Sequence, residues 1–61
     1  MTLKELLEKT SRFQRVKVFY DKSSRSGKSS ELLEHLGESW LKSPVMEIKA
    51  DFSELLVEVG D

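Results

Sequence analysis

The chain reads Gln14-Arg15-Val16-Lys17-Val18-Phe19-Tyr20 at the point where its apolar residues recur with a period of two. This alternation is typical of a β-strand with one buried face. One side of the strand carries Val16, Val18 and Tyr20, and the other side carries Arg15, Lys17 and Phe19. We therefore predict a strand over residues 14–20 whose valine side faces the core.

A short helix is predicted before this strand, over about residues 3–10. Thr2 and Glu5 have the spacing of a capping box, in which the two side chains satisfy backbone N–H groups at the start of a helix. The residues Leu3, Leu6 and Leu7 then recur with helical spacing. They predict one apolar face on this helix.

The segment that follows the strand, residues 21–28, contains no large apolar side chain. It is rich in serine and includes Gly27, and both residue types favour turns and loops. We therefore predict a solvated, flexible loop over about residues 21–29.

A second apolar stripe with helical spacing consists of Leu32, Leu33 and Leu36. It predicts a helix over about residues 30–36, with Ser29 or Ser30 as its N-cap and Gly37 as its left-handed end. Trp40 follows in a short connection, where its large side chain is suited to closing one end of the core.

Two further alternating segments, residues 45–50 and 55–59, predict a C-terminal hairpin. Met46, Ile48 and Ala50 are expected to face Leu55, Val57 and Val59. The sequence between them has two interpretations, because Asp51 and Glu54 form either a turn or the capping box of a short helix over residues 51–56. The β-branched Val57 and Val59 favour the strand.

These elements predict an α+β fold in the order α-β-α-β-β. We expect a small twisted sheet of about three strands with two short helices packed on one face. Because a chain of 61 residues supplies only one hydrophobic core, residues 1–61 are predicted to be a single small domain.

The composition limits which chemistry and which compartment are plausible. The chain has no cysteine, which excludes disulfides and thiolate metal sites and favours a reducing compartment. No apolar run approaches the roughly 20 residues that span a bilayer, and residues 1–5 lack the apolar stretch of a signal peptide. We therefore expect a cytoplasmic protein without membrane association.

Charge is distributed unevenly along the chain, although the net charge is only −1. Residues 12–28 contain six basic residues and one acidic residue, for a net charge of +5, whereas residues 29–61 contain two basic and eight acidic residues, for −6. Such asymmetry is typical of proteins that bind charged partners.

Motifs for catalysis are weak. Gly27-Lys28-Ser29 resembles the end of a phosphate-binding loop, but Lys22 stands where that motif needs its first glycine. The lone His35 is four residues from Glu31, a spacing that predicts a surface pair, and it has no further partner for a metal site or a catalytic triad. We predict no enzyme activity, no catalytic residue, no metal and no cofactor.

The best candidate binding surface is the basic and aromatic stretch over residues 12–28. Its members are Arg12, Phe13, Arg15, Lys17, Phe19, Lys22, Arg25 and Lys28. Aromatic rings among cations are typical of surfaces that bind single-stranded nucleic acid, because bases stack on the rings while cations hold phosphates.

A competing interpretation is that cross-strand ion pairs neutralise this stretch. Arg15 and Lys17 are then expected to pair with Glu47, Glu54 and Glu58 of the acidic half. Exposed aromatic residues also anchor protein interfaces. The leading hypothesis is therefore a small protein-interaction or regulatory factor with an unidentified protein partner, with self-association through sheet edges also possible; the alternative is a single-stranded nucleic-acid-binding module.

Several segments together resemble short uncharacterised proteins encoded by phages and integrative elements of Firmicutes. They are Thr2-Leu3-Lys4-Glu5-Leu6-Leu7, Val16-Lys17-Val18-Phe19-Tyr20-Asp21, Glu31-Leu32-Leu33, Trp40-Leu41 and residues 45–59. The resemblance implies an accessory or regulatory factor that acts by binding, and it brings no catalytic residue. The chain departs from it at residues 23–28, where those proteins often carry another apolar strand.

Overall fold

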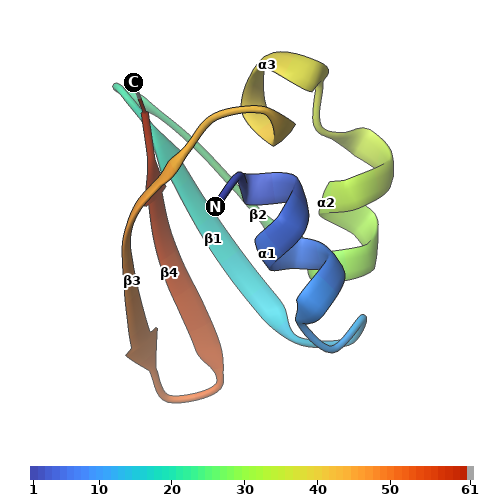
Figure 1. Ribbon diagram of the computed structural model, residues 1–61. Helices are drawn as coiled ribbons and strands as arrows, with labels where there is room; N and C mark the ends of the chain where they lie inside the picture. Colours follow the sequence, from blue (N-terminus) through green and yellow to red (C-terminus); the bar gives the residue numbers. More distant parts are fainter. Residues whose placement is uncertain (61) are drawn as a thin grey trace.

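Residues 1–60, which the computed structural model describes, form one four-stranded mixed β-sheet with three helices on one of its sides (Figure 1). The elements are α1 (Leu3–Lys9), β1 (Arg15–Tyr20), β2 (Ser23–Lys28), α2 (Ser29–His35), α3 (Glu38–Leu41), β3 (Val45–Asp51) and β4 (Glu54–Val59). The α+β class and the placement of the helices on one face are as predicted. The structure adds one strand and one helix.

The sheet consists of two antiparallel hairpins that lie side by side in the order β2-β1-β4-β3. The two central strands, β1 and β4, run parallel, and the helical connection α2–α3 links the two hairpins. Because β1 and β4 have a neighbouring strand on each side, their inward side chains are the best shielded of the sheet. Val16, Val18 and Val57 are accordingly almost fully buried.

Helix α1 begins at the predicted capping box. The Glu5 N–H donates to Thr2 Oγ1 at 3.3 Å, and the Thr2 N–H donates to Glu5 Oε1 at 3.0 Å. The second bond is the main cause that lowers the pKa of Glu5 below its ordinary value, because it stabilises the ionised carboxylate. Helix α1 therefore starts where two orphan donors are satisfied reciprocally.

The loop predicted over residues 21–29 is instead strand β2, which pairs with β1 in register from Tyr20↔Ser23 to Arg15↔Lys28. Asp21 takes a positive φ of 56° in the two-residue turn between the strands. Serine-rich sequence is compatible with a strand here because β2 is an edge of the sheet and its side chains are mostly exposed. Partner strand β1 supplies the apolar residues that β2 lacks.

The start and end of α2 also differ from the prediction. Neither Ser29 nor Ser30 is the N-cap; that position is Lys28, whose N–H donates to Glu31 Oε1 at 3.0 Å. Ser29 is the first helical residue and is fully buried, and its Oγ donates to the Leu7 carbonyl at 2.7 Å. Gly37 has φ −70° and is the N-cap of helix α3, which replaces the predicted connection.

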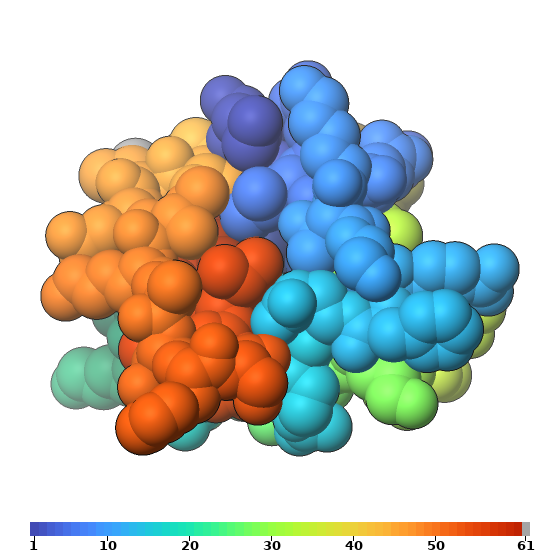
Figure 2. Space-filling view, turned by 90° about the horizontal axis from the view of Figure 1, so that it is seen from below, coloured from blue at the N-terminus to red at the C-terminus, as the bar shows by residue number. Residues whose placement is uncertain are grey.

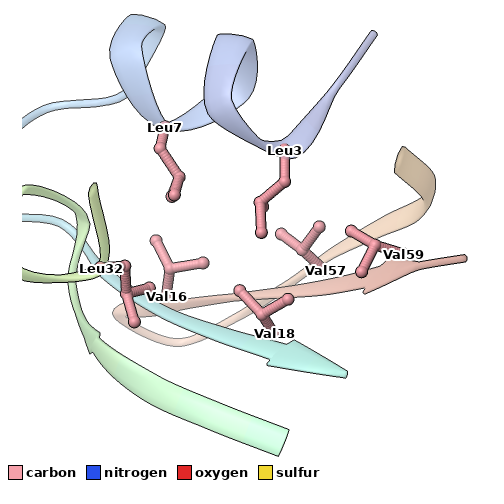
Figure 3. Close-up of a cluster of buried hydrophobic side chains, with 7 residues drawn as sticks. All are labelled: Leu3, Leu7, Val16, Val18, Leu32, Val57 and Val59. Atoms are coloured by element: carbon pink, nitrogen blue, oxygen red, sulfur yellow. The ribbon is translucent and has the colours of Figure 1, made fainter. Parts of the chain in front are cut away.

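The hydrophobic core lies between the helices and the inner face of the sheet (Figure 3). Its buried members are Leu3, Leu7, Val16, Val18, Leu32, Val57 and Val59. Trp40 of α3 is half-buried against this cluster, and its ring meets Tyr20 edge to face with 5.2 Å between centroids. The tryptophan thus packs at one end of the core, as its size predicted.

The C-terminal hairpin settles the two interpretations of residues 51–56 in favour of a turn and a strand, because β4 begins at Glu54. Ile48 pairs with Val57 as expected, but a register shift places Val45 rather than Met46 opposite Val59. The shift leaves Met46 exposed at the edge of the sheet.

Candidate functional site

No helix or strand of residues 1–60 covers the side of the sheet opposite the helices, and we call this side the outer face. It carries the residues that alternate with the buried ones, and strand register arranges them in three rows of four. The first row is Lys28, Arg15, Glu54 and Asp51; the second is Ser26, Lys17, Leu56 and Lys49; the third is Ser24, Phe19, Glu58 and Glu47. Each row runs from β2 across β1 and β4 to β3.

Two apolar side chains lie on the two central strands of the outer face. Phe19 and Leu56 are both half-buried, although no helix covers them. They line a shallow depression together with Glu58 and the two β3 residues Glu47 and Lys49. Protein interfaces usually combine a buried apolar part with surrounding polar and charged residues. This small depression has the same combination.

Opposite charges occupy opposite halves of the outer face. The β1–β2 half carries Lys28, Arg15 and Lys17, and the β4–β3 half carries Glu54, Asp51, Glu58 and Glu47. Lys49 also lies in the acidic half, and its Nζ is 3.7 Å from Glu47 Oε1. The outer face is therefore bipolar, with its boundary between the central strands.

The ion pairs expected to neutralise the basic half are not formed among residues 1–60. Arg15 is the register neighbour of Glu54, but no guanidinium nitrogen of Arg15 lies within 4.0 Å of a Glu54 carboxylate oxygen, and Lys17 is the neighbour of Leu56. Glu47 and Glu58 even lie opposite each other, an arrangement of like charges that destabilises a sheet. Both halves keep charges available to a partner.

The structure brings five of the eight predicted binding residues together. Lys17 Nζ lies 5.4 Å from the centroid of the Phe19 ring, and Lys28 Nζ lies 5.8 Å from that of Phe13. Arg15 stands between these two pairs in the first row of the outer face. These distances are within the range of cation–π attraction, so each ring holds a cation beside it.

The other three predicted residues point elsewhere. Arg25 belongs to the inner side of β2, where its guanidinium lies 5.5 Å from the centroid of the Trp40 ring. Lys22 is in the turn at the far end of the β1–β2 hairpin. Arg12 lines a depression beside α1 and α2, and its carbonyl accepts hydrogen bonds from the N–H and Oγ of Ser30. The stretch over residues 12–28 is thus no single surface.

Two exposed phenylalanines mark one end of the molecule. Figure 2 shows this end, with the α1–β1 connection and the β3–β4 turn on opposite sides of it. Phe13 in the connection is 72% exposed, and Phe52 in the turn is fully exposed. Gln14 Nε2 donates to the Ser53 carbonyl at 2.7 Å and ties the two segments together. The end therefore presents two aromatic side chains on a braced backbone.

Phe52 was not among the predicted site residues. Its φ is 52°, which costs a residue other than glycine about 1–2 kcal/mol, and its ring is in water. The sequence did contain a signal, because a phenylalanine in the turn-like Asp51-Phe52-Ser53-Glu54 has no core to enter. A large apolar residue held in strain and exposed points to a binding role.

Phe52→Gly is expected to raise the free energy of unfolding by about 0.5–1 kcal/mol. Glycine adopts positive φ without strain, and this gain exceeds the entropy that glycine adds to the unfolded chain. Urea titration followed by circular dichroism measures the change. The control is Ser53→Gly, where φ is not positive and a loss of about 0.5 kcal/mol is expected. Equal losses in both variants would mean that the Phe52 ring stabilises the fold.

Outside this face, the described residues that the sequence offered for chemistry are engaged in the fold or stand apart. The Ser29 hydroxyl, which a phosphate-binding loop would direct at its ligand, is buried against the Leu7 carbonyl. Glu31 is hydrogen-bonded to the Lys28 N–H, and no ion pair with His35 forms within the described part of the chain. Over residues 1–60 no three histidine, aspartate or glutamate side chains cluster as metal ligands, and no helix there is long and apolar enough to cross a membrane.

The fold and this face define a two-layer α+β protein with one open, bipolar sheet surface. Comparisons with protein-family models, with curated proteins and with solved structures find no match to the chain.

Proposed function

We propose that this protein is a non-enzymatic interaction factor of the cytoplasm that binds a protein partner through its outer face. One observation carries the proposal: within residues 1–60 a whole face of the sheet lacks a covering layer and has Phe19 and Leu56 on its two central strands. The resemblance to accessory proteins of phages and integrative elements supports a role in binding.

The charge pattern favours a protein partner. Glu54 lies beside Arg15, and Glu58 lies beside Phe19, so a polyanion on the basic half would run along a row of carboxylates. A protein surface can present both signs of charge and satisfy both halves at once. The half-buried Phe19 and Leu56 would supply the apolar centre that interfaces need.

Binding of single-stranded nucleic acid is the second candidate. The pairs Lys17–Phe19 and Lys28–Phe13 support it, because each combines a ring for stacking with a cation for phosphate. Such binding would weaken steeply with salt, since every neutralised phosphate releases condensed counterions.

Site-directed photo-cross-linking in cells tests both candidates. A benzophenone side chain at Leu56 is expected to capture one protein, and Phe19→Ala combined with Arg15→Ala is expected to abolish the adduct. The matched control combines Lys9→Ala with Glu34→Ala, two exposed residues on the helices, and should leave the adduct unchanged. A nucleic-acid adduct would favour the second candidate. An adduct that survives the Phe19 and Arg15 substitutions would contradict binding through the outer face.

A further inference from the structure

We infer that the partner which the outer face fits is a second copy of this chain, docked face to face about a two-fold axis parallel to the strands. The inference rests on the proposed function, since it names the occupant of the same face. The observation behind it is that the basic and acidic halves lie on either side of one line, the boundary between β1 and β4.

The direction of the symmetry axis follows from this arrangement. Two sheets that pack face to face keep their strands nearly aligned. A two-fold axis across the strands would place each basic half on the basic half of the other copy. An axis along the strands exchanges the halves, so that β1 lies over β4 and β2 over β3 of the second copy. Only this second orientation brings opposite charges together.

The first row of the outer face becomes complementary in this dimer. Arg15 meets Glu54 of the second copy, and Lys28 meets Asp51 of the second copy, because these pairs are equally distant from the axis. The two-fold axis repeats each contact, which gives four opposite-charge contacts from four kinds of residue.

The third row of the outer face is also complementary to the third row of the second copy. The register of the strands places Phe19 opposite Glu58 of the second copy. The ammonium group of Lys17 lies over the ring of Phe19, so this cation also faces that carboxylate. Glu47 meets Ser24 of the second copy, whose hydroxyl is a hydrogen-bond donor. Within one chain Glu47 lies opposite Glu58, and the dimer adds a polar partner for Glu47 beside Lys49 and a cation for Glu58.

The aromatic end takes part as well. Phe13 lies beside Lys28, and Phe52 follows Asp51 in the chain. Exchange of the two halves therefore brings the Phe13 corner of one copy to the Phe52 corner of the other. The dimer explains why the turn keeps an exposed phenylalanine at a positive φ.

The face is small, so the dimer is weak. Strands about 4.8 Å apart and residues rising about 3.3 Å each give a face of roughly 20 by 20 Å. Two such faces bury roughly 800 Å² in total, below the usual size of a stable interface. We expect a dissociation constant on the order of 100 µM, with weaker association as salt screens the charges.

Sedimentation equilibrium of the full chain over a range of about 10 µM to 1 mM tests the dimer. The mass of the wild-type protein should rise from 7.0 kDa toward twice that value. Arg15→Glu and Glu54→Arg should each weaken self-association by about tenfold or more, because each reverses two contacts in the dimer. An equal mixture of the two variants should associate again, since each then carries the charges that the other lacks.

A second pair of variants separates the interface from effects within one chain. The variants are Lys28→Glu and Asp51→Lys. Lys28 and Asp51 lie on the two opposite edge strands of the sheet, so their side chains are not neighbours within one chain. These two variants should also associate with each other when mixed, but neither should associate with itself. The control pair, Lys9→Glu and Glu34→Lys on the helices, should behave like the wild type. Amide NMR spectra of the isolated variants report whether each one folds.

Three outcomes would overturn the inference. The first is a wild-type mass of 7.0 kDa at every concentration. The second is a dimer that ignores all four charge reversals. The third is folded variants whose mixtures do not associate. None of them contradicts the proposed function, which the cross-link at Leu56 tests separately.

Discussion

Leu7→Ala is expected to lower the free energy of unfolding by about 3 kcal/mol. Leu7 is 1% exposed and lies between α1 and the buried valines of the sheet, as Figure 3 shows. Its truncation removes buried methyl groups and leaves a cavity that a rigid sheet cannot fill. A domain of this length has a total stability of only about 3–9 kcal/mol, so this loss amounts to roughly a third or more of the total.

Urea titration followed by Trp40 fluorescence measures the loss. Leu6→Ala is the matched control, because Leu6 is the neighbouring residue of the same helix and is only half-buried. A loss of about 1 kcal/mol is expected there. Equal losses in the two variants would mean that the buried face of α1 is not the one that carries Leu3 and Leu7.

The periodic segments of the sequence predicted most of the fold. Alternation over residues 14–20 predicted β1 and its buried valines, and Thr2 with Glu5 predicted the start of α1. These signals were reliable because a buried face and a cap each require particular residue types at fixed spacing. The C-terminal alternation likewise predicted β3 and β4, within one residue at each end.

Strand β2 was missed because its residues have no strand pattern of their own. An edge strand with exposed side chains needs only backbone partners, and β1 supplies them at every position. Ser24 and Ser26 are therefore free to be polar. This pairing can be predicted from the sequence of β2 only if β1 is already known to need a neighbouring strand on each side.

The candidate site was predicted in part. The alternation that buried the valines also placed Arg15, Lys17 and Phe19 on one outer face. What the sequence could not supply was register across strands. Leu56 lies beside Lys17, and Glu54 lies beside Arg15, because β1 and β4 pair in parallel. This pairing joins two segments that are about 40 residues apart in the sequence. The bipolar surface follows from that pairing.

Ser29→Asp is expected to lower the free energy of unfolding by about 3 kcal/mol or more. At a helix start an aspartate is normally favourable, because it caps N–H groups and suits the helix dipole. Ser29 is instead fully buried, and its hydroxyl donates to the Leu7 carbonyl. An aspartate there would bury a carboxylate against an acceptor and remove the only side-chain hydrogen bond shown between α1 and α2.

The neighbouring Ser30→Asp provides the comparison. Ser30 is half-buried, and its hydroxyl donates to the Arg12 carbonyl at 3.1 Å, so an aspartate there can reach water and should cost about 1 kcal/mol. Ser29→Ala should fall between the two, at about 1–2 kcal/mol, because it loses the hydrogen bond without burying a charge. If Ser29→Asp were as stable as the wild type, Ser29 would act as the cap that the sequence predicted. The expected order would instead show that α2 is joined to α1 by a buried serine, which holds the two helices together on their side of the sheet.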